Sequence, residues 1–256
     1  MTNSIPPVLE PGHASEGPLP IRSSVPPLLG SPAVLKVEAL KGHELWADCY
    51  DSQPNPLLHR EEREILSCLK DVEGKIVVDV ACGTGRWTRQ SLRLGASQVI
   101  GLDASPAMLR QAARRVPANT LVQADATALP VGSLSADIVL CSFAIAYLED
   151  LNRAVFEWRR VLKPCGTLWC SDFHPDALEF GWKRTFKKNG LTYELLSHRR
   201  SAAEIRACLR QYFRTVDSQD LYLEEAETHL VSPGHAPWAL PGVPHPPAVL
   251  LFCCRD

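Results

Sequence analysis

The sequence predicts an α/β fold, in which a doubly wound parallel sheet carries helices on both faces. From about residue 56 onward, apolar strand-like runs alternate with segments of helical periodicity, a pattern typical of parallel sheets with right-handed crossovers. The runs are continuously apolar, as expected for strands that are covered on both faces. The first run ends in a loop of small residues, 81–85, where a ligand can lie against the backbone.

Each predicted element has a local signature. The helix from residue 56 places Leu58, Ile65 and Leu69 on one face and charges on the other. The helix from Ser105 begins with a capping hydroxyl and has Pro106 in its first turn. We expect strands at 75–80, 97–105, 119–125, 136–143, 166–173 and 247–255, and helices at 56–72, 86–95, 105–116, 149–162 and 201–212.

Three segments fall outside this alternation. Residues 1–34 are proline-rich and aperiodic, so we expect an extended or disordered arm before one domain over 35–256. Insertions at 173–200 and 225–247 have no clear elements and are typical of lids or binding walls. The first mixes aromatic and basic residues, which fits a short amphipathic helix over the site with Trp182 or Phe186 in its wall. A fixed helix that completes the core explains the same residues equally well.

Bulk composition limits the classes of partner. The 256 residues are 45% hydrophobic with a formal net charge of -2, which provides no general electrostatic reason to bind nucleic acid or an anionic membrane. No apolar run approaches the roughly 20 residues of a membrane span. The N-terminus lacks the pattern of a signal peptide. We therefore expect a cytoplasmic monomer or homodimer that does not act on membranes, with its nine cysteines reduced.

Three acidic residues occur at or near the ends of successive predicted strands: Asp79, Asp103 and Asp125. Ligands of doubly wound sheets bind beyond the carboxyl ends of the strands. The loop 81–85 presents backbone N–H groups and the positive end of the following helix there. At this edge Asp103 can accept two ribose hydroxyls, and Asp125 can meet an exocyclic amine of a base.

These residues also carry a family resemblance. The motifs VVDVACGTG, GLDAS, QADATALP, DIVLCSFAIAYLED and VLKPCGTLWCSDF resemble, in order and spacing, those of class I S-adenosylmethionine-dependent methyltransferases. The likeness covers residues 45–172 and is closest to the small-molecule group around the ubiquinone-type C-methyltransferases. It implies a seven-stranded, mostly parallel sheet with an antiparallel last strand, and S-adenosyl-L-methionine as cofactor. Ala81 replaces the first glycine of the motif, a mild change provided that its φ is negative.

The resemblance implies cofactor-binding roles on successive loops. The methionine end would be held by Asp79, Ala81, Cys82, Gly83 and Gly85 and covered by Tyr50. The ribose would be bound by Asp103 beside Ala104, and the adenine would be contacted by Met108 or Leu109 and by Asp125 and Ala126. Ser142 and Phe143 would form the far wall. Tyr50 and Phe143 are equally well explained as core aromatics.

The expected reaction is methyl transfer to oxygen, or to nitrogen or carbon, of a small, partly apolar metabolite. A nucleophile that starts protonated needs a base, and the candidates are Asp172 and His174 just past the fifth strand and His198 before the next helix. His174 is equally well a residue that caps its own loop. Ser142 stands where catechol-type enzymes have a metal-binding acid, so we expect no metal. The stretch CSFA replaces the box of nucleic-acid amine methylases, so we expect no nucleic-acid substrate.

Two rival functions are compatible with parts of the pattern. A nicotinamide-binding Rossmann oxidoreductase would need glycine at position 88, where this chain has Thr88. A cofactor-binding domain that serves as a sensor or scaffold without catalysis is neither supported nor excluded by the residues.

Overall fold

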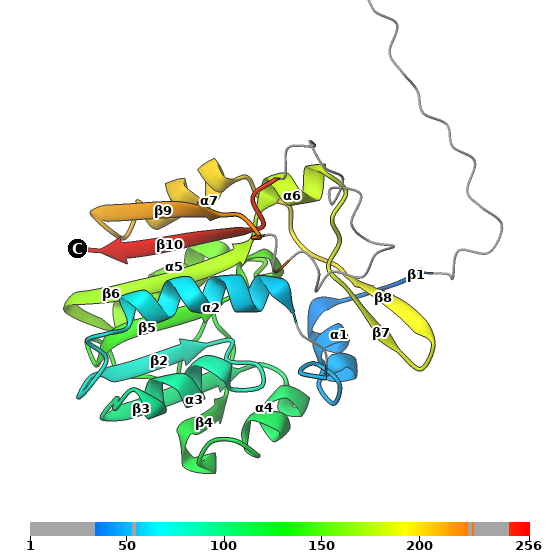
Figure 1. Cartoon of the computed structure of the whole chain (residues 1–256). Helices are drawn as coiled ribbons and strands as arrows, with labels where there is room; N and C mark the ends of the chain where they lie inside the picture. The colour runs from blue at the N-terminus through cyan, green and yellow to red at the C-terminus, as the bar shows by residue number, and fades with distance from the viewer. Residues whose placement is uncertain (1–33, 53–54, 225–226, 228–245) are drawn as a thin grey trace, which may run out of the picture. The chain divides into compact units, whose positions relative to one another are not determined.

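The computed structural model describes residues 34–52, 55–224, 227 and 246–256. Its main feature is a seven-stranded sheet with the order β4-β3-β2-β5-β6-β10-β9 (Figure 1). All neighbours pair in parallel except β10, which is antiparallel to β6 and β9. The predicted fold class, including the antiparallel last strand, is therefore confirmed. The strands are β2 Ile76–Val80, β3 Gln98–Asp103, β4 Leu121–Gln123, β5 Ala136–Ser142, β6 Leu162–Phe173, β9 Thr215–Leu221 and β10 Val249–Arg255.

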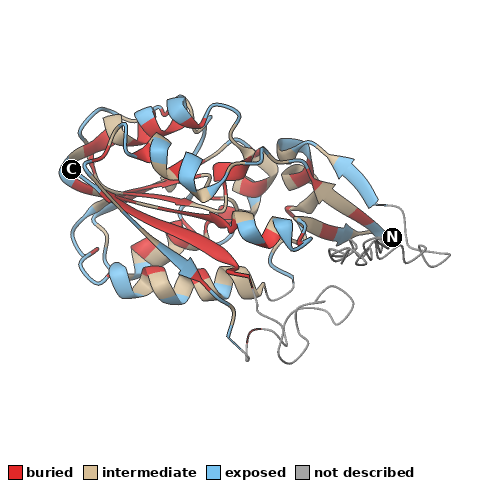
Figure 2. Ribbon diagram, turned by 90° about the horizontal axis from the view of Figure 1, so that it is seen from above, coloured by how far each residue is buried: buried red, intermediate tan, exposed pale blue. Residues whose placement is uncertain are grey.

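Helices cover both faces of this sheet. Successive residues of a strand point to opposite sides, and both sides carry apolar residues that need to be covered. Val77 packs with the face that α2 and α3 cover, whereas Val78 packs with the face covered by α5 and α7. Figure 2 shows the buried residues concentrated along the strands between these helix layers. The helices are α2 Pro56–Cys68, α3 Arg86–Arg93, α4 Pro106–Ala112, α5 Leu151–Val161, α6 Pro175–Glu179 and α7 Ala202–Leu209, with 3-10 turns η1 Ala118–Thr120 and η2 Ile145–Tyr147.

Helix starts follow the local chemistry of the sequence. The Ser105 hydroxyl accepts the Met108 N–H at 3.3 Å, and Pro106 occupies the first turn of α4, as predicted. Ser201 and Glu204 form a reciprocal capping box at the start of α7. Both caps satisfy N–H groups that have no partner inside the helix.

A second, three-stranded sheet lies at the carboxyl ends of the main strands (Figure 1). Its order is β1-β8-β7, formed by β1 Val34–Val37, β7 Thr185–Lys188 and β8 Leu191–Leu195. Helix α1, Ala39–Trp46, contacts β7 and β8. The sequence-based prediction placed no element at β1 or α1.

The amphipathic helix predicted within 173–200 is wrong, because β7 and β8 form a hairpin there. Asn189 and Gly190 both have positive φ, of 50° and 76°, the conformation that favours Asn-Gly in two-residue hairpin turns. Three aromatic residues of this segment, Phe173, Trp182 and Phe186, are nevertheless buried, whereas Phe180 is exposed. Phe186 stacks on Trp46 of α1 and on Tyr193. The predicted arm 1–34 and the insertion 225–247 lie almost wholly outside the described residues.

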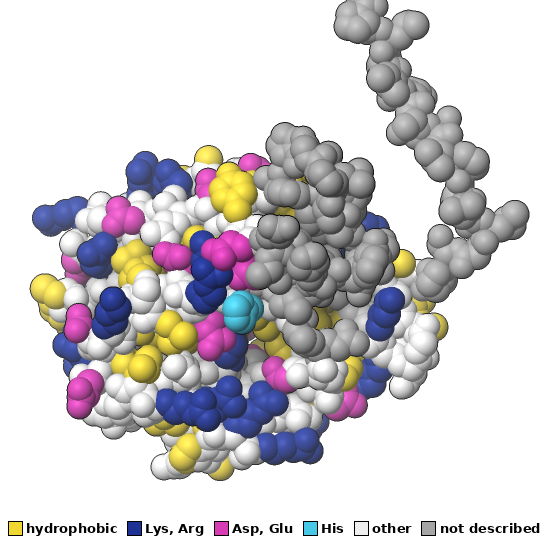
Figure 3. Space-filling view, viewed as in Figure 1, with side chains coloured by type: hydrophobic (Ala, Val, Ile, Leu, Met, Phe, Trp, Pro, Cys, Tyr) yellow, Lys and Arg dark blue, Asp and Glu magenta, His cyan; other side chains and the backbone are white. Residues whose placement is uncertain are grey.

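On the face that Figure 3 shows, the described residues include both basic and acidic side chains, with hydrophobic side chains between them and a row of basic side chains low on the face. None of the helices in the described ranges is long and apolar enough to cross a membrane.

Candidate active site

A cavity of about 550 Å³ lies at the carboxyl ends of β2, β3 and β5, where residues from α1 also line it. Ten of the residues predicted to bind a cofactor line it together. They are Tyr50, Ala81, Gly83, Asp103, Ala104, Met108, Asp125, Ala126, Ser142 and Phe143. Of the other three, Asp79 and Cys82 are buried behind this lining, and Gly85 begins helix α3.

Asp103 is the ionisable group best placed to meet a polar ligand. Its Oδ2 accepts the Gly83 N–H and its Oδ1 accepts the Ser105 N–H, both at 2.8 Å. Burial raises the pKa of this carboxyl, and the two N–H groups oppose that effect. A carboxylate has about four acceptor positions, so two remain for hydroxyls of a ligand.

Asp79 supports the glycine-rich loop from behind. Its Oδ2 accepts the Thr88 hydroxyl at 2.6 Å, which ties β2 to α3. Burial raises the pKa of Asp79 to about 7. Gly101 on the neighbouring strand leaves room for this contact, because a Cβ there would lie 2.6 Å from Thr88 Oγ1. The carboxylate therefore shapes the loop and does not line the cavity.

Two non-glycine residues of the lining have left-handed backbones. Ala81 and Phe143 both have φ of +54°, so the condition under which alanine would be a mild replacement for the first glycine of the motif is not met. A left-handed conformation costs an L-residue roughly 1–2 kcal/mol, and such strain clusters at functional sites. The Phe143 N–H donates to the Ser171 carbonyl at 2.9 Å, which helps to hold the turn.

Gly83 and Gly85 take left-handed φ values of 56° and 80°. At Gly83 nothing lies within 4 Å of the position that a Cβ would occupy, so its backbone is open to a ligand. At Gly85 a Cβ would lie 3.1 Å from the Ala112 Cβ, so this glycine allows α3 and α4 to approach each other.

Asp125 closes a local turn at the end of β4. Its Oδ1 accepts both the Thr127 N–H at 2.7 Å and the Thr127 hydroxyl at 2.8 Å. The carboxylate lines the cavity together with Ala126.

Behind Ser142 lies a buried polar cluster that the sequence-based prediction missed. Glu61 of α2 is fully buried, and its Oε1 accepts the hydroxyls of Ser142, at 2.7 Å, and Ser171. Its Oε2 accepts from the Arg86 guanidinium, which also donates to Ser142 Oγ at 2.9 Å. The cluster fixes the Ser142 side chain from two sides.

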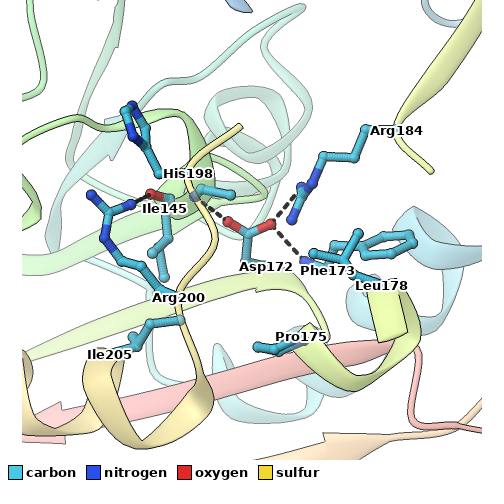
Figure 4. Close-up of a pocket in the computed structure, with 10 residues that line it drawn as sticks. Ile145, Asp172, Phe173, Pro175, Leu178, Arg184, His198, Arg200 and Ile205 are labelled. Carbon is cyan, nitrogen blue, oxygen red and sulfur yellow. Dashed lines mark hydrogen bonds and ion pairs between the residues drawn. The ribbon is translucent and has the colours of Figure 1, made fainter. Parts of the chain in front are cut away.

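The three predicted catalytic residues lie away from this lining. Asp172 and His198 line a much smaller pocket of about 10 Å³. Figure 4 shows the Asp172 carboxylate directed at Arg184 and at backbone N–H groups, with the His198 ring turned away from it. Arg184 donates to Asp172 Oδ1 at 2.7 Å, and Ala146 N donates to Oδ2 at 2.6 Å.

His174 caps the start of α6. This is the structural role that the sequence offered as an alternative to a catalytic one. Its Nδ1 accepts the Asp176 N–H at 3.1 Å, and its Nε2 lies 3.3 Å from Asp220 Oδ1. Both ring nitrogens are therefore engaged by residues outside the cavity lining.

Apart from Tyr50, the outer side of the cavity comes from residues that the sequence-based prediction missed. Leu40 and His43 of α1 face Tyr147 and Leu148, which follow β5. The rings of His43 and Tyr147 meet edge to face at 4.9 Å, and Trp46 lies 4.6 Å from Tyr50. Residues 40, 43 and 47 are spaced so that they lie on one face of a helix. This spacing was the sequence signal from which α1 could have been predicted.

No group of three or more His, Cys, Asp or Glu side chains with metal-binding geometry occurs within residues 34–52, 55–224, 227 and 246–256.

Comparisons with known proteins agree with this arrangement. A family model described as a methyltransferase domain matches residues 78–170. A malonyl-[acyl-carrier protein] O-methyltransferase of Xylella fastidiosa is 34% identical over 139 residues, covering 52% of this chain and 47% of that protein. A demethylmenaquinone methyltransferase of Renibacterium salmoninarum is 37% identical over 117 residues, covering 45% and 49%. This chain thus spans about half the length of the curated relatives it matches.

A solved structure has the same fold. It is an S-adenosylmethionine-dependent methyltransferase from Mesorhizobium loti, with 23% identity and a TM-score of 0.61 over 77% of this chain and 98% of that one. Residues 78–170 therefore resemble a methyltransferase domain, and the chain shares the fold of an S-adenosylmethionine-dependent methyltransferase of known structure.

Proposed function

We propose that this protein binds S-adenosylmethionine in the 550 Å³ cavity and transfers its methyl group to a small, partly apolar acceptor, with oxygen as the first choice of atom. The observation that carries the proposal is the Asp103 carboxylate, with two free acceptor positions, beside the open backbone of Gly83. A ribose needs the first feature, and a close-lying methionine chain needs the second.

The lining residues fit the parts of this cofactor in turn. Asp103 accepts the ribose hydroxyls, Met108 packs against the adenine, and Asp125 with Ala126 lies at its amine edge. Ala81 and Gly83 lie along the methionine end, next to the hydroxyl of Ser142 that Glu61 holds in place.

When bound, the cofactor supplies a methyl group on a positively charged sulfur, which leaves with the electron pair of the broken carbon–sulfur bond. The chain's task is to orient the acceptor and exclude water. Tyr50, Phe143 and Tyr147 supply aromatic surface to the lining for this purpose.

The rest of the lining indicates the kind of acceptor that fits the cavity. The names of the relatives cover a carrier-bound malonyl group and a demethylated quinone, which share little beyond a methyl-accepting atom. Leu40 and Leu148 add apolar side chains to the lining, whereas Glu149 and Asp150 add acids. This mixture favours a partly apolar metabolite as substrate.

Position 88 disfavours the rival oxidoreductase. Thr88 is fully buried and donates its hydroxyl to Asp79, so the place that a dinucleotide fingerprint gives to glycine is occupied by a structural contact. A sensor or scaffold would bind the same cofactor in the same cavity, so only a measurement of methyl transfer distinguishes it from an enzyme.

A pair of measurements tests the proposal. Calorimetry with S-adenosylmethionine on the full chain should show saturable binding. Incubation with methyl-labelled S-adenosylmethionine and a metabolite extract should transfer label to a small molecule. Binding without transfer would favour the sensor or scaffold, and absence of binding would contradict the cofactor assignment.

A further inference from the structure

His43 is the one histidine in the lining of the main cavity, among the residues that the structure describes. It lies in the last turn of α1, half-buried, with its ring edge-to-face against Tyr147. Neither the family resemblance nor the functional proposal above gives it a role.

The hydrogen bonding of His43 determines which ring nitrogen carries the proton. Its Nδ1 lies 2.8 Å from the Ala39 carbonyl oxygen. Because a carbonyl can only accept, Nδ1 holds the hydrogen and the neutral ring keeps its lone pair on Nε2. No residue in the described part of the chain hydrogen-bonds to Nε2.

The charges around the ring suit a proton acceptor. Burial lowers the pKa of His43, so the ring is neutral near pH 7, and the Arg184 cation at the start of the hairpin acts in the same direction. The Ala39 carbonyl and the Asp103 carboxylate at the end of β3 oppose that effect and favour the protonated ring. Tyr147 of η2 is a further titratable neighbour, and burial raises the pKa of its hydroxyl.

We infer that His43 is the general base of the reaction, accepting at Nε2 the proton of an acceptor hydroxyl. This inference rests on the proposed methyl transfer. As the acceptor oxygen bonds to the methyl carbon, its O–H electron pair stays on oxygen, the proton moves to Nε2, and the carbon–sulfur pair leaves with sulfur. The imidazolium keeps its Nδ1–H bond to Ala39, lies near Asp103, and releases the proton to water.

The geometry favours His43 over the histidines predicted from sequence. Both ring nitrogens of His174 are engaged by Asp176 and Asp220, whereas Nε2 of His43 has no such partner among the described residues. The His198 ring is turned away from Asp172 beside the smaller pocket (Figure 4).

The test uses His43→Asn in the full chain, since an asparagine amide can still donate to the Ala39 carbonyl but has no basic nitrogen. His59→Asn is the matched control, because His59 is an exposed histidine on α2 with 62% of its side chain accessible. Three quantities are measured: binding of S-adenosylhomocysteine by calorimetry, the rate of labelled methyl transfer into a metabolite extract, and the histidine nitrogen shifts by NMR.

We expect His43→Asn to bind S-adenosylhomocysteine within threefold of wild type and to transfer methyl about 10²–10⁴-fold more slowly, the usual contribution of a general base. In the wild type, the NMR spectrum should show the Nδ1–H form of His43 titrating below pH 6.5, and the transfer rate should rise through that pKa. The profile of His43→Asn should lose this rise.

Three results would overturn the inference: wild-type transfer by His43→Asn, a binding loss that accounts for the whole rate loss, or an Nε2–H tautomer. A wild-type chain that binds S-adenosylhomocysteine but transfers nothing would contradict the proposed function itself, and the inference with it.

Discussion

The cavity has two walls of different origin. The inner wall is formed by the ends of β2, β3 and β5, where backbone turns and short-range bonds such as Ser105 N to Asp103 Oδ1 determine each position. The outer wall is formed by α1 and the turn after β5, and the hairpin β7–β8 supports it through contacts between distant residues, such as Phe186 with Trp46. The inner wall carries the glycine-rich loop and the strand-end acids and suits the proposed cofactor. The outer wall combines the turn after β5, which lies within the family motifs, with α1, which lies before them, and suits the proposed acceptor. The proposed cofactor site and the proposed acceptor site therefore lie on opposite sides of one cavity.

The largest expected effect concerns the support of the outer wall. Arg184 and Asp172 form an ion pair whose side chains are 7% and 3% exposed, and the Arg184 guanidinium also lies over the Tyr147 ring at 5.3 Å. Arg184→Met leaves a buried carboxylate without its cation and should lower the free energy of unfolding by about 3–5 kcal/mol. Chemical denaturation measures the change.

The neighbouring Lys183→Met is the control for this prediction, because Lys183 is 59% exposed and pairs with Glu194 on the surface. It should cost less than about 1 kcal/mol. Equal effects of the two variants would show that the ion pair does not hold the outer wall together.

On the inner wall, Asp103→Asn should weaken S-adenosylmethionine binding about 10- to 100-fold, since a hydrogen bond to a charged group contributes roughly 1.5–3 kcal/mol. Asp137→Asn is the matched control. Asp137 also accepts a backbone N–H, from Ile76 at 2.9 Å, but it lies at the opposite end of the sheet. Calorimetry that shows the same loss for both variants would attribute the effect to general destabilisation and contradict the ribose assignment.

The next effect depends on pH. Burial raises the pKa of Asp79 from 3.8 to about 7, so between these values the folded chain holds a proton that the unfolded chain releases. The free energy of unfolding should therefore fall as pH rises through this window, by up to about 1.4 kcal/mol per unit. Asp79→Asn keeps an acceptor for Thr88 but does not titrate.

Urea denaturation at pH 4.5, 6 and 8 would measure this contribution. Relative to wild type, Asp79→Asn should gain stability as pH rises to about 7, with no further change above it. Parallel curves for the two proteins would show that Asp79 is ionised throughout.

The smallest effect concerns backbone strain in the inner wall. Ala81→Gly removes a left-handed alanine and should stabilise the fold by about 0.5–1 kcal/mol, after the greater unfolded-state entropy of glycine is subtracted. Ala104→Gly is the control, since Ala104 also lines the cavity but does not have a positive φ. It should be neutral or destabilising, and an equal gain in both would contradict the strain at Ala81.

The difference between the inner and outer walls also explains how much of the site could be predicted from the sequence. Asp103, Gly83 and Met108 lie in short motifs whose backbone geometry is local, so their shared place at the sheet edge could be predicted. The hairpin was missed although Asn189–Gly190 is a strong local turn signal, because aromatic and basic residues around it were read with helical spacing. His43 and Glu61 could not be placed, since part of their surroundings comes from residues 60 or more positions away: Asp103 for His43 and Ser142 for Glu61.

Hydrogen exchange on the full chain, with and without saturating S-adenosylhomocysteine, tests most directly whether the two walls enclose one ligand. We expect slower amide exchange both at residues 82–85 and 103–108 of the inner wall and at residues 40–50 of the outer wall. Amides of β9, which do not line the cavity, should be unchanged. Protection of the inner wall alone, or no protection at saturation, would contradict a site built from both walls.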